Sequence, residues 1–103
     1  MKIKINHIGY TVTVKKRQDF LKSERYDSSF DKCPCVCERQ DKNNSIIYID
    51  NPKKDIVSLA HEVLHVIQYI CSDRNIDFID EKEHCAHMLH YILNTVIGDE
   101  YDI

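Results

Sequence analysis

The residues with the clearest chemical potential are two histidines and a glutamate in the segment His61-Glu62-Val63-Leu64-His65. On a helix, residues four apart lie one turn apart on the same side, so both imidazoles can reach one metal ion. Glu62 lies about 100° around the helix from His61, where its carboxylate reaches a water on the ion rather than the ion itself. This is the His-Glu-x-x-His pattern of zinc metallopeptidases. The alternative is two solvated histidines on a helix surface.

A catalytic zinc site needs a third protein ligand and leaves its fourth position for water. The C-terminal part of the chain offers four candidates: Glu83, His84, His87 and His90. Glu83, His87, His90 and Asn94 share one stripe of a helix. Glu83 would complete a His₂Glu site and His87 a His₃ site, and the spacing does not choose between them. His87, His90 and Tyr91 are candidate transition-state stabilisers, and a polar helix surface is the alternative interpretation of the stripe.

The elements expected to position these residues are strands followed by two helices. Residues 3–14 alternate as a hairpin does, and Gly9 takes a positive φ in the turn at 6–9. Residues 17–30 permit a short helix followed by a loop at Asp27-Ser28-Ser29. Further strands are expected at 35–40 and 45–50. One helix is expected at 52–71, started by Asn51-Pro52, and another at 80–97, stopped by Gly98.

The apolar positions of both helices follow helical spacing and define a core face for each. They are Ile56, Ala60, Val63, Ile67 and Ile70 in the first helix, and Cys85, Leu89, Ile92 and Val96 in the second. The predicted fold class is α+β. A small antiparallel sheet, made of the N-terminal hairpin and the second strand pair, packs on two C-terminal helices.

The five cysteines are odd in number and follow no secretion signal, which argues against a disulfide framework. Cys33, Cys35 and Cys37 alternate with other residues, so a strand would place all three thiols on one face. A second metal site or a redox centre would usually use a two-residue gap. The favoured interpretation is therefore reduced, half-buried strand cysteines.

The composition limits the class of protein. A chain of 103 residues, 43% hydrophobic and 30% charged with net charge −3, fits one domain over residues 1–103 and excludes intrinsic disorder. No apolar run approaches the roughly 18 residues of a membrane span, and the N-terminus lacks a signal peptide, so we expect a cytoplasmic protein without membrane contact. Lys15-Lys16-Arg17 is the only basic cluster, which argues against nucleic-acid binding.

The stretch from Ile46 to Leu93 resembles the small zincin-like metallopeptidases of phage and bacterial genomes, related to the ImmA/IrrE and SprT-like groups. The matching segments are Ile47-Tyr48-Ile49-Asp50, Leu59-Ala60-His61-Glu62-Val63-Leu64-His65 and Glu83-His84-Cys85-Ala86-His87-Met88-Leu89. The resemblance implies a minimal zincin-like domain with a Zn²⁺ ion, Glu83 as the third ligand, and the host cytoplasm as location if the chain is phage-encoded. The clustered cysteines depart from the family pattern.

Three functions follow as hypotheses. The first is a zinc-dependent metallopeptidase that hydrolyses a peptide bond in a protein or peptide substrate, with Glu62 as general base. The alternative is a non-catalytic, zinc-stabilised binding module that acts on a host or regulatory protein. A weaker third hypothesis is a redox or metal sensor built on Cys33, Cys35 and Cys37.

Overall fold

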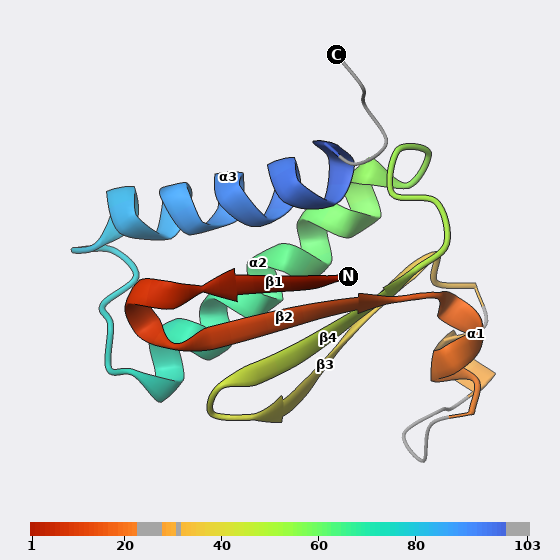
Figure 1. Ribbon diagram of the computed structural model, residues 1–103, viewed down its shortest axis with the longest axis horizontal. Coiled ribbons are helices and arrows are strands. Elements are labelled where there is room, and N and C mark those ends of the chain that lie inside the picture. Colours follow the sequence, from red (N-terminus) through yellow and green to blue (C-terminus); the bar gives the residue numbers. More distant parts are fainter. Residues whose placement is uncertain (23–27, 31, 99–103) are drawn as a thin grey trace.

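The computed structural model describes residues 1–22, 28–30 and 32–98. Two helices pack on a four-stranded sheet, which confirms the predicted α+β class (Figure 1). The strands are β1 (Lys2–Ile5), β2 (Tyr10–Lys15), β3 (Cys35–Asp41) and β4 (Asn44–Ile49), and the long helices are α2 (Ile56–Asp73) and α3 (Lys82–Gly98). Short helical turns are η1 (Asn6–Ile8), α1 (Arg17–Phe20) and η2 (Ser28–Phe30).

The sheet has the strand order β1-β2-β4-β3 and is mixed. Each hairpin is antiparallel, as predicted, with Ile3 opposite Val12 and Cys37 opposite Ile47. The two hairpins join through β2 and β4, which pair in parallel, and this pairing was not predicted. Parallel pairing of β2 with β4 requires a long connection between them. Here β3 follows β2 in the sequence but lies at the far edge of the sheet, and β4 then lies between β3 and β2. As a result, β3 is an edge strand.

The turns are set by local chemistry. Gly9 has φ 62°, the left-handed conformation expected of it, and its N–H donates to the carbonyl of Asn6. The first long helix begins at Ile56 rather than at Pro52. The Asn51 side chain accepts a hydrogen bond from the N–H of Lys54, which makes residues 51–55 a separate turn before the helix. Gly98 is the last residue of α3, in agreement with its predicted role.

The larger core lies between one face of the sheet and the two long helices. From α2 it takes Leu59, Val63, Val66, Ile67, Ile70 and Cys71, and from α3 it takes Cys85, Met88, Ile92 and Val96. Ile56, predicted to be in the core, is instead exposed at the first turn of α2.

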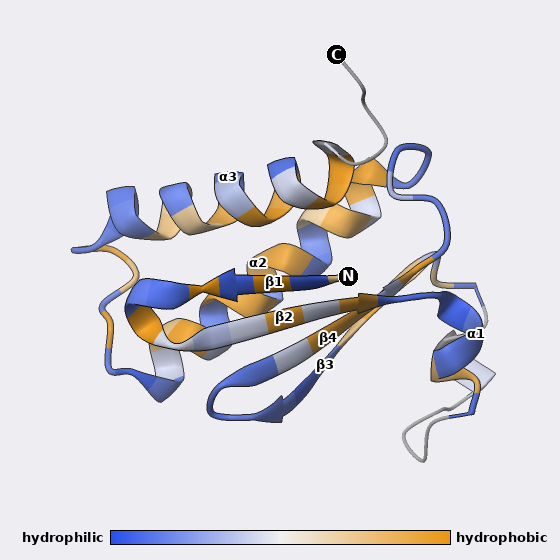
Figure 2. Cartoon of the chain, in the orientation of Figure 1, coloured by the Kyte–Doolittle hydropathy of each residue, from blue (hydrophilic) through white to orange (hydrophobic). Residues whose placement is uncertain are grey.

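α3 is apolar along the side facing α2 and hydrophilic along its outer side (Figure 2). A smaller core of Phe20, Val36, Ile46 and Tyr48 covers the other sheet face.

The short helix predicted within residues 17–30 is confirmed as α1, and Ser28–Phe30 forms a 3₁₀ turn. Asp27, predicted to begin the loop, lies outside the described residues.

Arg74, at the C-terminal end of α2, joins the helix to both hairpin turns. Its guanidinium donates hydrogen bonds to the carbonyl of Ile8 at 2.8 and 3.1 Å and to that of Lys42 at 2.7 Å. It also donates to the side-chain oxygen of Asn43 at 2.7 Å and lies 5.2 Å from the ring centre of Tyr10. One side chain therefore fixes the end of α2 relative to the sheet.

Arg74→Ala should lower the free energy of unfolding by about 2 kcal/mol, because several carbonyls lose a charged donor. Arg74→Lys should recover only part of the loss, since an ammonium lacks the planar fork that spans two turns. Urea unfolding measures both values, with exposed Lys54→Ala as the control. A loss in Arg74→Ala no larger than the control would contradict this role.

Candidate functional site

The direction of each α2 side chain follows from the burial of the helix. Leu59, Val63 and Val66 lie on the stripe buried against the sheet. At about 100° per residue, His61 and His65 must then lie on the opposite side, and Glu62 lies on a flank between them and the buried stripe. The structure agrees: His61 is exposed, and His65 and Glu62 are half-buried.

The two histidines of the predicted zinc pattern are brought together. Their Nε2 atoms lie 3.1 Å apart, and their rings meet edge-on with centres 4.7 Å apart. His65 Nδ1 is 3.0 Å from Gln68 Oε1, so an Nδ1–H that donates to this oxygen leaves the Nε2 lone pair free for a metal. Two nitrogens bound tetrahedrally to one zinc lie roughly 3.3 Å apart. The imidazole pair therefore fits two positions of a zinc site.

Glu62 faces the edge strand β3. The thiol of Cys37 makes a hydrogen bond with its carboxylate, and Cys37 Sγ also lies 3.7 Å from the hydroxyl of Tyr69. The Tyr69 ring stacks near His65, with centres 6.5 Å apart. A series of contacts between α2 and β3 thus joins an imidazole, a phenol, a thiol and a carboxylate.

The thiols of Cys35 and Cys37, which lie near Glu62, stay protonated at neutral pH. Burial, followed by the nearby Glu62 carboxylate, raises the pKa of Cys35 to about 12 and that of Cys37 to about 12. Burial and the hydrogen bond with Cys37 also raise the pKa of Tyr69 to about 12. Because the thiolate is the metal ligand and the nucleophile, neither cysteine is poised for either role at neutral pH.

Glu83 is not brought to the imidazole pair. Its side chain is 84% exposed on α3, and its carboxylate lies 4.0 Å from the ring of His87, which is 80% exposed. His84 instead contacts His7. Across the residues the structure describes, no three His, Cys, Asp or Glu side chains are grouped to hold a metal ion. Two zinc ligands therefore fit in this structure, and the third is not in place.

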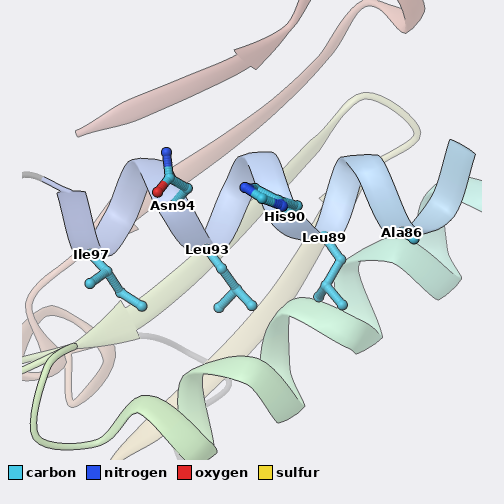
Figure 3. A pocket seen from close by; sticks show the side chains of 6 residues that line it. All are labelled: Ala86, Leu89, His90, Leu93, Asn94 and Ile97. Carbon is cyan, nitrogen blue, oxygen red and sulfur yellow. The ribbon is translucent and has the colours of Figure 1, made fainter. Parts of the chain in front are cut away.

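The candidate transition-state stabilisers lie on α3. Tyr91 donates a hydrogen bond to the carbonyl of Lys4 on β1 at 3.2 Å. His90 lines a pocket of about 340 Å³ whose walls all come from α3 (Figure 3). There Leu89 and Leu93 point toward α2, whereas His90 and Asn94 do not. The roles of His87, His90 and Tyr91 stay predictions.

The three clustered cysteines do not share one face. Cys35 and Cys37 face α2, but Cys33 packs against the smaller core on the other side of the sheet. β3 begins only at Cys35, directly after Pro34, which has no N–H to give to a strand ladder. The prediction of a single face is therefore wrong for Cys33. All five cysteines are free thiols.

Comparison with known proteins adds no relative: no family model, curated protein or solved structure matches this chain. Within the described residues, no helix combines the length and the apolar character that crossing a membrane requires.

Glu62→Gln should speed the alkylation of Cys37 at alkaline pH. Removing the carboxylate lowers the pKa of Cys37 from about 12, so more thiolate is present at any given alkaline pH. Tyr69→Phe should act in the opposite direction, because the Tyr69 hydrogen bond lowers this pKa. Iodoacetamide labelling followed by peptide mass spectrometry measures both rates. Equal rates in all three proteins would show that Glu62 does not interact with Cys37.

Proposed function

We propose that this protein is a zinc-dependent peptidase whose metal is held by His61 and His65, with Glu62 as general base. The observation that carries the proposal is the 3.1 Å separation of the two Nε2 atoms on the outer side of a helix whose orientation is fixed by its buried stripe. Imidazole nitrogens so placed suit zinc. When bound, zinc lowers the pKa of a water and polarises a carbonyl.

Glu62 supports the role of base by its position. It lies on the flank of α2 between the two imidazoles and β3, where its carboxylate would take a proton from a water that the metal holds. The protonated thiol of Cys37 donates a hydrogen bond to the carboxylate and restrains its orientation. This role for Glu62 requires its carboxylate to accept a proton from water and pass it to the leaving amine.

The edge position of β3 supports a peptide as substrate. One side of β3 pairs with β4, and the other side has no strand partner in the described sheet. An extended peptide can add to such an edge through main-chain hydrogen bonds. A peptide on β3 would lie beside Glu62, because Cys37 of that strand contacts the carboxylate.

Glu62→Gln should keep zinc and lose hydrolysis by at least about 100-fold, the size of a general-base contribution. Elemental analysis of untagged protein gives zinc per chain, and cleavage of a quenched peptide library gives activity. Glu81→Gln, on the exposed turn before α3, is the control and should leave both unchanged. Unchanged hydrolysis in Glu62→Gln would exclude Glu62 as the base.

Glu83→Ala should lower the affinity for zinc about tenfold or more if Glu83 is the third zinc ligand. A catalytic zinc needs three protein ligands, and the resemblance implies Glu83 as the third. The proposal therefore requires Glu83 to leave His87 and approach α2 when the metal binds. Zinc titration of the wild type, Glu83→Ala and His87→Ala measures this. Equal affinity in the wild type and Glu83→Ala would remove Glu83 from the ligand set.

One observation favours the second candidate, a non-catalytic zinc-stabilised binding module. Among the described residues no third metal ligand lies beside His61 and His65, whereas catalytic zinc requires one. Such a module would bind its partner protein equally well in the wild type and in Glu62→Gln. Hydrolysis by the wild type that disappears in Glu62→Gln decides for the peptidase.

A further inference from the structure

A second group of histidines lies away from His61 and His65, in a groove of about 460 Å³ between the β1 end of the sheet and α3. His7, His84 and His87 line it together with apolar side chains that include Ile5 and Met88. Half of the six histidines of the chain therefore line one groove, and of these three only His87 has a candidate role in the proposed peptidase.

Within the groove, the Nε2 atoms of His7 and His84 are in hydrogen-bonding contact. The two atoms lie 2.8 Å apart, and the ring centres are 5.1 Å apart at 47°. Two nitrogens bound at right angles to one ion, each about 2.0–2.1 Å from it, lie roughly 2.9 Å apart. The pair thus already has the separation of two neighbouring ligands of a single metal ion.

We propose that His7 and His84 form a second metal site, which binds a divalent transition-metal ion of the class that imidazole prefers. Zinc, nickel and copper belong to this class, whereas magnesium and calcium prefer oxygen ligands. Water would fill the remaining positions on the ion, because in this groove two imidazole nitrogens meet. The groove gives the ion access from solvent.

The position of this site predicts a structural role. His7 follows β1 and His84 lies in the first turn of α3, 77 residues apart in sequence. An ion bound by both histidines would cross-link the two ends of this 77-residue segment. The two histidines come together only in the folded chain, so the site is absent from the unfolded chain. Binding must therefore stabilise the fold in proportion to metal concentration. By contrast, His61 and His65 lie on one helix, so an ion between them closes no long segment.

The test uses the full, untagged chain carrying His61→Ala and His65→Ala, so that the first imidazole pair cannot contribute. Zn²⁺ titrated into this protein should bind at one equivalent and raise the melting temperature, and Mg²⁺ should do neither. Adding His7→Ala or His84→Ala should weaken zinc binding at least about tenfold and abolish the thermal response. Adding His90→Ala, an exposed histidine of the same helix, should leave zinc binding unchanged.

His84→Gln provides a check that does not depend on a truncated side chain, since glutamine keeps a hydrogen-bonding group but is a poor zinc ligand. It should fold normally by circular dichroism and still lose the zinc response. The proposal is overturned if the His61→Ala/His65→Ala protein binds no zinc, which would leave a plain hydrogen bond between the imidazoles. It is equally overturned if zinc binds as tightly after His7 or His84 is replaced.

Discussion

The burial of α2 against the sheet is the constraint on which the rest of the structure depends. Each buried aliphatic side chain contributes roughly 1.5–3 kcal/mol, so the five buried aliphatic residues of α2 contribute about as much as the net stability of a whole domain. Turning the helix by one residue about its axis would expose several of them. The outward direction of His61 and His65 and the sideways direction of Glu62 are consequences of this packing, and Arg74 reinforces it at the end of the helix.

The same constraint explains why the structure brings two of the predicted metal ligands, His61 and His65, together but leaves the third, Glu83, apart from them. The imidazole pair lies on a single helix at a spacing of four residues, so its geometry is local and preorganised. A third ligand on α3 depends on how two helices pack. In this structure α3 turns Cys85, Met88 and Ile92 inward, and Cys85 Sγ lies 3.4 Å from Cys71 Sγ of α2. Glu83, two residues before Cys85, consequently faces away from α2.

Sequence periodicity was enough to predict both helices, the two hairpins and the positions of His61 and His65, because each depends on residues within a few turns of one another. It was not enough for the parallel pairing of β2 with β4, which depends on the path of the long connection between β2 and β3. The contact of Cys37 with Glu62 depends on how a strand and a helix 25 residues apart lie on one another. His7 lies in the turn that the sequence predicts at residues 6–9, but its partner His84 lies far along the chain, which local periodicity does not reveal.

The chemistry beside Glu62 illustrates how a nonlocal contact alters a local motif. The carboxylate of Glu62 accepts a hydrogen bond from the thiol of Cys37, which lies on β3 and 25 residues earlier in the sequence. The thiol keeps its proton because burial and the negative charge of Glu62 both raise its pKa, so the pair carries one charge rather than two. A neutral donor of this kind orients the carboxylate without neutralising it, and so preserves the property that a general base requires. Cys35 and Cys37, which correspond to nothing in the family pattern, therefore support the active-site hypothesis by their position on the strand that faces α2.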